Sequence, residues 1–171
     1  MNISMYQASV PVFVHFLSAL SDILKKGAEY CTAKKIEPSV LVGSRLSPDM
    51  FALARQVQIA TDHAKGAAAR LSGSAIPSFP DTDTTFDELQ ARIAKTLDYI
   101  QSFKPEQIDG SDERDIELVI AKQKYPFKGK DYLLHFALPN FFFHVTTAYD
   151  ILRHCGVEIG KRDFMGMHES K

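Results

Sequence analysis

The sequence predicts an all-α protein, a four-helix bundle with a small β-hairpin before the last helix, in a single domain spanning residues 1–171. Four segments carry apolar residues at three- and four-residue spacing, which gives each helix one apolar side. Such sides are buried only against one another. One short segment alternates apolar and polar residues, as a half-buried strand does. The 171 residues, 45% hydrophobic and 24% charged, are typical of one globular domain.

The first predicted helix begins near Pro11 and continues at least to Lys26. A proline is tolerated in the first turn of a helix. Gly27 weakens the helix without necessarily ending it. Residues 36–46 include a proline and a glycine without a helical stripe, so a loop is expected there. The apolar side of this first helix consists of Val10, Phe13, Val14, Leu17, Leu20 and Leu24.

The second predicted helix begins at Ser47-Pro48-Asp49 and ends before Gly73. The serine hydroxyl is a capping group, the missing proline N–H costs nothing in a first turn, and the acid lies near the positive end of the helix dipole. Many small residues on its apolar side allow a neighbouring helix to approach closely. Residues 76–83 are expected to be a connection because they hold two prolines among polar residues.

The third predicted helix starts with a capping box and is followed by a hairpin. Thr85 and Glu88 have the three-residue spacing of that box, and Lys104-Pro105 ends the helix. From Ile116 to Phe127 the apolar residues alternate with polar ones, which predicts two short strands.

The last part of the chain is predicted to hold a short helix and then a long one. Asp131 is a candidate cap for a helix through Leu138, and Pro139 interrupts the chain there. A new apolar stripe of Phe141, Val145, Ala148 and Leu152 follows and ends at Gly156. The tail, residues 157–171, is expected to wrap over the bundle or fray.

Charge and composition exclude two classes of partner. With 20 basic and 21 acidic residues, the formal net charge is -1. Such a balanced surface does not generate the broad positive electrostatic field that nucleic-acid binding needs. No stretch approaches the roughly 20 apolar residues of a membrane span, so no membrane partner is expected. Cys31 and Cys155 are too few for a disulfide framework and suggest free thiols in a cytoplasmic protein.

Histidines are the main candidates for a functional site. No two of the six stand at i and i+4, the spacing that lets two imidazoles of one helix hold one ion. His144, beside the last apolar stripe, is the first candidate, followed by His63 and His135. Each has an alternative interpretation as a hydrogen-bonded structural side chain. The aromatic run 141–143, with Tyr149, indicates a fully buried helix, a pocket wall or a dimer contact.

Several stretches resemble an uncharacterised bacterial domain family of the DinB/YfiT-like four-helix superfamily. They are residues 131–144, with the motif DYLLHFALPNFFFH, and residues 148–153, 156–164, 58–73 and 84–97. The resemblance covers nearly the whole chain and implies a DinB-like four-helix bundle that forms homodimers. Members of the superfamily resemble metalloenzymes in which a histidine of helix two and a His-x-x-x-His pair of helix four bind a divalent metal. Some transfer low-molecular-weight thiols.

Carried onto this chain, the resemblance gives an incomplete metal site. His63 stands near the helix-two ligand and His144 matches the first histidine of the pair, but the second falls on Ala148. A methyl group does not coordinate, and two imidazoles alone hold zinc weakly unless His135, a carboxylate or water completes the shell.

We therefore expect no metal and no cofactor. The favoured interpretation is a cytoplasmic, homodimeric protein whose groove binds a small-molecule ligand, with His144, His135, His63 and Tyr149 as the ligand-binding candidates. One alternative is a divergent metal-dependent thiol transferase or hydrolase with His63 and His144 as ligands. Another is an interaction module that uses the aromatic helix. The sequence leaves open whether the protein is an enzyme.

Overall fold

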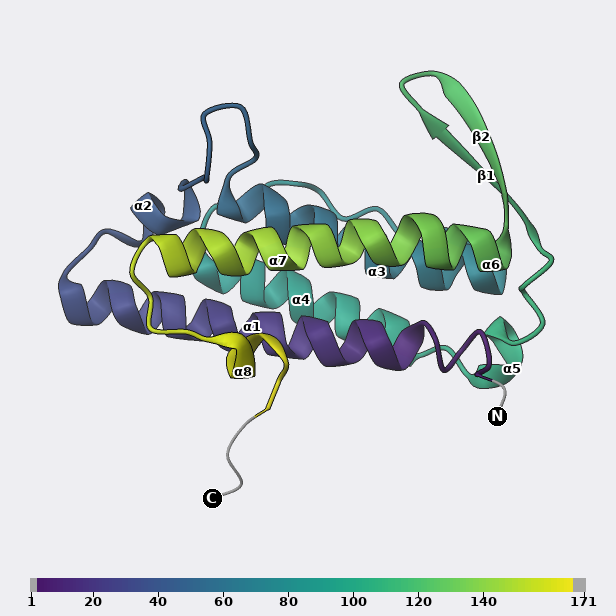
Figure 1. Cartoon of the computed structure of the whole chain (residues 1–171), viewed down its shortest axis with the longest axis horizontal. Coiled ribbons are helices and arrows are strands. Elements are labelled where there is room, and N and C mark those ends of the chain that lie inside the picture. Colours follow the sequence, from purple (N-terminus) through teal and green to yellow (C-terminus); the bar gives the residue numbers. More distant parts are fainter. Residues whose placement is uncertain (1–2, 168–171) are drawn as a thin grey trace.

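Four long helices enclose the core of the computed structural model, which describes residues 3–167 (Figure 1). They are α1 (Val10–Lys34), α3 (Leu53–Ser72), α4 (Phe86–Gln101) and α7 (Leu138–His154). α1 packs against α4 and α7, and α3 packs against the same two helices, so α1 and α3 lie diagonally across the bundle. The predicted helical class is confirmed, with its hairpin before the last long helix. Among the described helices, none is long and apolar enough to cross a membrane.

α1 continues past Gly27, which lies at a close helix contact. A Cβ at this position would meet the Phe86 and Leu152 side chains at 3.2 Å. The glycine therefore allows α4 and α7 to approach α1 within the core.

Two short helices occupy connections that cross between the long ones. α2 (Pro38–Val42) lies within residues 36–46, where a loop was expected, and buries Leu41 and Val42. α5 (Pro105–Ile108) follows α4 and buries Ile108. Both begin with a proline, whose missing N–H is unneeded in a first turn.

The predicted start of the second helix at Ser47-Pro48-Asp49 is wrong, because α3 begins at Leu53. The Ser47 hydroxyl donates to the Asp49 carboxylate at 2.6 Å instead of accepting from a helix N–H. The Leu53 N–H donates to the carbonyl of Ser44 at 2.9 Å. These local bonds hold residues 44–52 as an irregular loop.

The predicted capping box of α4 is confirmed. The Glu88 N–H donates to Thr85 Oγ1 at 3.2 Å, and the Thr85 N–H donates to Glu88 Oε2 at 3.0 Å. These bonds hold the pKa of the Glu88 carboxyl below its ordinary value, together with those from Thr84, which are the largest cause.

The hairpin consists of β1 (Asp115–Ile120) and β2 (Gln123–Lys128), paired antiparallel. Its two-residue turn places Ala121 and Lys122 at positive φ, as the favoured hairpin turns require. Ile116 and Leu118 are buried, whereas Val119 is 65% exposed. The hairpin stands out from the bundle beside α6 and α7 (Figure 1).

The interruption predicted at Pro139 is also wrong. α6 (Gly129–Tyr132) passes through a π-helical turn, η1 (Leu133–Ala137), directly into α7 (Figure 1). Pro139 lies in the first turn of α7, and the wider turn before it accommodates a residue without an N–H.

The tail docks on α1 as expected, through the short helix α8 (Lys161–Phe164). Asp163 forms an ion pair with Lys26 at 2.5 Å. His15 Nε2 lies 2.9 Å from the carbonyl oxygen of Met165. His168 and the rest of the tail after it lie outside the described residues.

Candidate functional site

The structure brings His63 of α3 and His144 of α7 side by side. Their ring centres are 5.9 Å apart and their planes differ by 13°. α3 packs closely against α7, and both helices bury small side chains: Ala60, Ala64, Ala67 and Ala68 of α3, and Ala148 of α7.

Both imidazoles are neutral at pH 7. Burial, and then the neighbouring His144, lowers the pKa of His63 from 6.5 to about 4. Burial also lowers the pKa of His144, with a smaller contribution from the positive charge of Arg55. His144 is 9% exposed, and His63 is half-buried.

Gln56 fixes the tautomer of His144. Gln56 Nε2 donates to the carbonyl of Phe51 at 3.1 Å, and a carbonyl only accepts, so Gln56 Oε1 is the atom that faces His144. His144 Nδ1 lies 2.7 Å from this Oε1 and therefore carries the proton. His144 Nε2 then keeps its lone pair and is available as a hydrogen-bond acceptor or proton acceptor.

A pocket of about 230 Å³ opens beside His63, between α3 and the hairpin. Residues 118–120 of β1 line one side, together with the aromatic ring of Phe136 of η1, whose centre is 5.8 Å from that of the His63 ring. Asp62 and Arg70 of α3 line the polar side. An apolar cavity with a few polar groups is the usual form of a small-molecule site.

Arg70 lies on this pocket with part of its guanidinium held by Tyr132. Arg70 NH1 donates to the Tyr132 hydroxyl at 3.1 Å, and the guanidinium carbon lies 5.6 Å from the centre of the Tyr132 ring. Burial raises the pKa of the Tyr132 hydroxyl, which remains a neutral partner.

The other two candidates lie apart from the pair. His135 is exposed on η1. Tyr149 packs its ring against Phe164 of α8, with centres 5.9 Å apart, and so faces the docked tail. The described contacts therefore group His63 with His144, Phe136 and Arg70, and the ligand-binding role of all four predicted residues stays a prediction.

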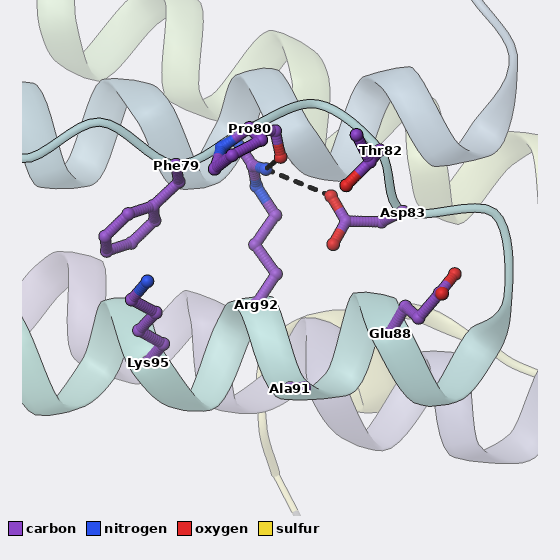
Figure 2. Close-up of a pocket in the computed structure, with 8 residues that line it drawn as sticks. All are labelled: Phe79, Pro80, Thr82, Asp83, Glu88, Ala91, Arg92 and Lys95. Carbon is purple, nitrogen blue, oxygen red and sulfur yellow. Dashed lines mark hydrogen bonds and ion pairs between the residues drawn. The ribbon is translucent and has the colours of Figure 1, made fainter.

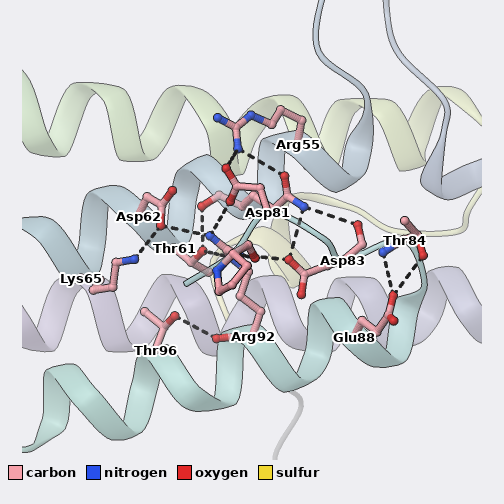
Figure 3. Close-up of polar contacts among 12 residues, drawn as sticks. Arg55, Thr61, Asp62, Lys65, Asp81, Asp83, Thr84, Glu88, Arg92 and Thr96 are labelled. Atoms are coloured by element: carbon pink, nitrogen blue, oxygen red, sulfur yellow. Dashed lines mark hydrogen bonds and ion pairs between the residues drawn. The ribbon is translucent and has the colours of Figure 1, made fainter. Parts of the chain in front are cut away.

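Beside the pocket, Arg92 of α4 is the centre of a polar network (Figure 3). Its side chain is 3% exposed, and its guanidinium donates from all three nitrogens. The acceptors are Thr61 Oγ1, the Pro80 carbonyl, and the carboxylates of Asp62, Asp81 and Asp83, at 2.8–3.0 Å. The network ties the connection between α3 and α4 to both helices and holds Asp62 at the pocket edge.

Two other side chains of α3 extend the network. Lys65, 5% exposed, pairs with Asp62 at 2.9 Å, and Arg55 pairs with Asp81. Sequence reasoning missed this cluster. The available signal was Arg92, a charged residue between Leu89 and Thr96 on the buried side of a predicted helix.

A second pocket, of about 250 Å³, lies at the outer edge of the network (Figure 2). Lys95 points at the Phe79 ring, with Nζ 4.1 Å from its centre. Arg92 crosses the pocket floor to Asp83. The five donors of Arg92 are already taken by protein groups, so this floor has no free guanidinium N–H for a ligand.

The metal ion that the resemblance implies does not fit this donor set. Catalytic zinc takes three protein ligands, and here His63 and His144 supply two nitrogens. Ala148 is a buried methyl, and Asp62 Oδ1 is held by both Lys65 and Arg92. Within residues 3–167, no three His, Cys, Asp or Glu side chains are grouped to hold an ion.

Comparison with known proteins gives a family and a similar solved structure. Residues 5–165 match the family model described as a domain of unknown function, DUF1993. The fold is similar to the crystal structure of a DinB family member protein from Shewanella denitrificans, with a TM-score of 0.87 and 39% sequence identity over 97% of this chain and 94% of that chain. No curated protein matches. The expected DinB-like bundle is confirmed.

Proposed function

The chain belongs to the DUF1993 family, and we propose that it binds a small organic molecule, without a bound metal, in the pocket beside His63. The observation that carries this proposal is that three kinds of side chain line one cavity. His63 is a neutral imidazole, Arg70 is a cation, and residues 118–120 with Phe136 form an apolar wall. Such a combination orients a ligand at its polar end and desolvates the rest of it.

His144 supports this role from behind His63. The His144 ring is fixed by its hydrogen bond to Gln56 and lies parallel to the His63 ring at 5.9 Å, which limits the space in which the His63 ring can move. A site held in its binding geometry loses less conformational freedom on association. The volume of about 230 Å³ favours a metabolite-sized molecule, because pockets for drug-sized ligands measure roughly 300–1,000 Å³.

Histidine side-chain NMR of the full chain against a panel of small metabolites tests this function. Ligands are expected to shift the His63 ring signals, and the His63→Leu variant is expected to lose the binding. His154→Leu is the matched control, since His154 is exposed at the end of α7. A panel in which no compound distinguishes wild type from His63→Leu contradicts the proposal.

The metal-dependent transferase or hydrolase is the alternative function. The pairing of His63 with His144 favours it, and the lack of a third side-chain ligand among the described residues counts against it. Metal analysis of untagged protein separates the two. Stoichiometric zinc or nickel that is lost in His144→Ala would overturn the metal-free proposal.

We also propose that the protein is a homodimer. The support is an exposed apolar surface: Phe143 of α7 is 57% exposed and Phe51 is 56% exposed. The loop before α3 and the hairpin, with Val119 at 65% exposure, project on the same side of the bundle (Figure 1). We infer that these exposed apolar side chains contact the second copy.

Light scattering tests the dimer. Phe143→Glu is expected to yield a monomer, whereas Met167→Glu, a substitution of an exposed residue on the side of α8, leaves the dimer intact. A monomeric wild-type protein contradicts the proposal. Cytoplasmic location is proposed on the ground that Cys31 and Cys155 are free thiols.

A further inference from the structure

Arg70 carries a positive charge that no described side chain balances. Among residues 3–167, no carboxylate forms an ion pair with it. The neighbouring network is neutral, because three cations, Arg55, Lys65 and Arg92, face three anions, Asp62, Asp81 and Asp83. The only hydrogen bond that the Arg70 guanidinium makes to a described residue uses one of its five N–H groups, toward the Tyr132 hydroxyl.

Gly66 makes room for this guanidinium. A Cβ at Gly66 would lie 2.5 Å from Arg70 NH1. A glycine in the interior of a helix is less stable than an alanine there, so its presence in the middle of α3 calls for a packing reason. The bare backbone at Gly66 lets the Arg70 side chain fold back along the preceding turn to Tyr132 and the pocket.

Two other polar side chains of α3 line the pocket: His63, and Asp62, whose charge is already paired with Lys65 and Arg92. The remaining lining residues are apolar. Leu118, Val119 and Ile120 approach from β1, and Phe136 from η1. A guanidinium beside an apolar wall suits a ligand with one planar anionic end and a hydrocarbon body, because Arg binds a carboxylate through two parallel hydrogen bonds. A phosphate dianion, in contrast, is best held by several donors, such as a helix N-terminus, which this pocket does not combine with its apolar wall.

We infer that the ligand of this pocket is a small apolar carboxylate, that Arg70 pairs with its carboxylate group, and that Gly66 positions the guanidinium for that pairing. This inference rests on the proposed function. The ligand carboxylate gives Arg70 the negatively charged partner that no side chain in the described part of the protein provides. Residues 118–120 and Phe136 cover the hydrocarbon, and His63 borders the same cavity.

The test compares monocarboxylates with their primary amides on the full chain. The probes are butyrate, phenylacetate and benzoate, each beside the amide of the same skeleton, with inorganic phosphate as a third arm. Affinity is measured by calorimetry, and the location of binding by the shifts of the His63 ring signals in NMR spectra. At least one carboxylate is expected to bind about tenfold or more tightly than its amide, as the strength of charge-assisted hydrogen bonds implies.

Variants assign the effect to Arg70. Arg70→Gln is expected to remove the preference for carboxylate over amide, and Arg70→Lys to retain part of it. Gly66→Ala, which displaces the guanidinium, is expected to weaken carboxylate binding. Arg114→Gln is the matched control, because Arg114 lies near the end of α3 at Gly73 but does not line the pocket.

The outcomes separate this inference from the proposed function. Amides that shift His63 as strongly as the carboxylates would overturn the carboxylate assignment and leave small-molecule binding intact. Phosphate that binds more tightly than every carboxylate, in an Arg70-dependent way, would also overturn it. If neither carboxylates nor amides shift the His63 signals, the inference fails, and the panel experiment on wild type and His63→Leu decides the proposed function separately.

Discussion

Gln56 Oε1 lies 2.7 Å from His144 Nδ1, and because the other end of the Gln56 amide is held by the Phe51 carbonyl, the proton on His144 stays on Nδ1. One amide on α3 thus sets the chemistry of an imidazole on α7. The free lone pair on His144 Nε2 is therefore a consequence of the contact with Gln56 and not of the residues of α7 around His144.

Replacing Gln56 with leucine is expected to destabilise the protein by about 1–3 kcal/mol, because the buried Nδ1–H of His144 loses its acceptor. Urea unfolding measures the loss. Gln123→Leu, at an exposed position of β2, is the matched control and is expected to stay within about 0.5 kcal/mol of wild type. Equal stability of Gln56→Leu and wild type would contradict the bond.

Arg92→Met is expected to cost about 3–5 kcal/mol, because it leaves three carboxylates without their shared buried partner. The connection between α3 and α4 is expected to become protease-sensitive, since Arg92 holds Pro80, Asp81 and Asp83. Arg55→Met is the comparison: its pair with Asp81 is more than a third exposed on both sides and is worth about 1 kcal/mol or less. Similar losses in both variants would refute the central role of Arg92.

Acid is expected to destabilise the fold through His63. Its pKa is about 4 in the folded protein and 6.5 when unperturbed, so the unfolded chain binds the proton first as the pH falls. The contribution of His63 to stability is therefore complete above pH 6.5 and is lost between pH 6.5 and 4, by on the order of 3 kcal/mol in total.

The check is the unfolding free energy at several pH values in that range. The difference between wild type and His63→Gln isolates this residue from the carboxylates that titrate nearby. His154→Gln, at an exposed site, is expected to follow wild type. Parallel pH profiles for wild type and His63→Gln would show that His63 is not buried as described.

Ala148→His is expected to create a zinc site that residues 3–167 of the natural chain do not complete. Ala148 lies one turn after His144, so an imidazole there joins His63 and His144 as a third nitrogen ligand. The added volume in the core is expected to lower stability by about 1–3 kcal/mol without zinc. Zinc uptake by the untagged variant, absent from His63→Leu/Ala148→His, is the measurement; no uptake would contradict the placement of the two histidines.

Much of the architecture is predictable from the sequence, because its signals are local. The stripes of α1 and α4, the Thr85–Glu88 capping box and the alternation in β1 each depend on residues within one or two turns. The wrong start at Ser47 and the wrong interruption at Pro139 have the same origin. In both places the residues satisfy a standard local pattern in another way: the Ser47 hydroxyl bonds to Asp49 in a loop, and Pro139 lies in the first turn of a helix that continues from a π-helical turn.

The site is less predictable because its parts come from separate elements. The family resemblance named His63 and His144, and the structure places them together. Gln56, Arg70 and Arg92 were not among the candidates, although Arg92 stands on the buried side of its helix and Gly66 interrupts a helix without ending it.

Periodicity, charge balance and short capping patterns sufficed to specify a helical bundle with a hairpin, since these depend on the chain over a few residues at a time. The pocket depends instead on how the alanine-rich side of α3 packs against α7. It also depends on the position of residues 118–120 of β1 beside α3. Those placements arise from packing between segments more than fifty residues apart, such as Arg70 with Tyr132. A sequence pattern spans only a few neighbouring residues, so it does not predict such contacts.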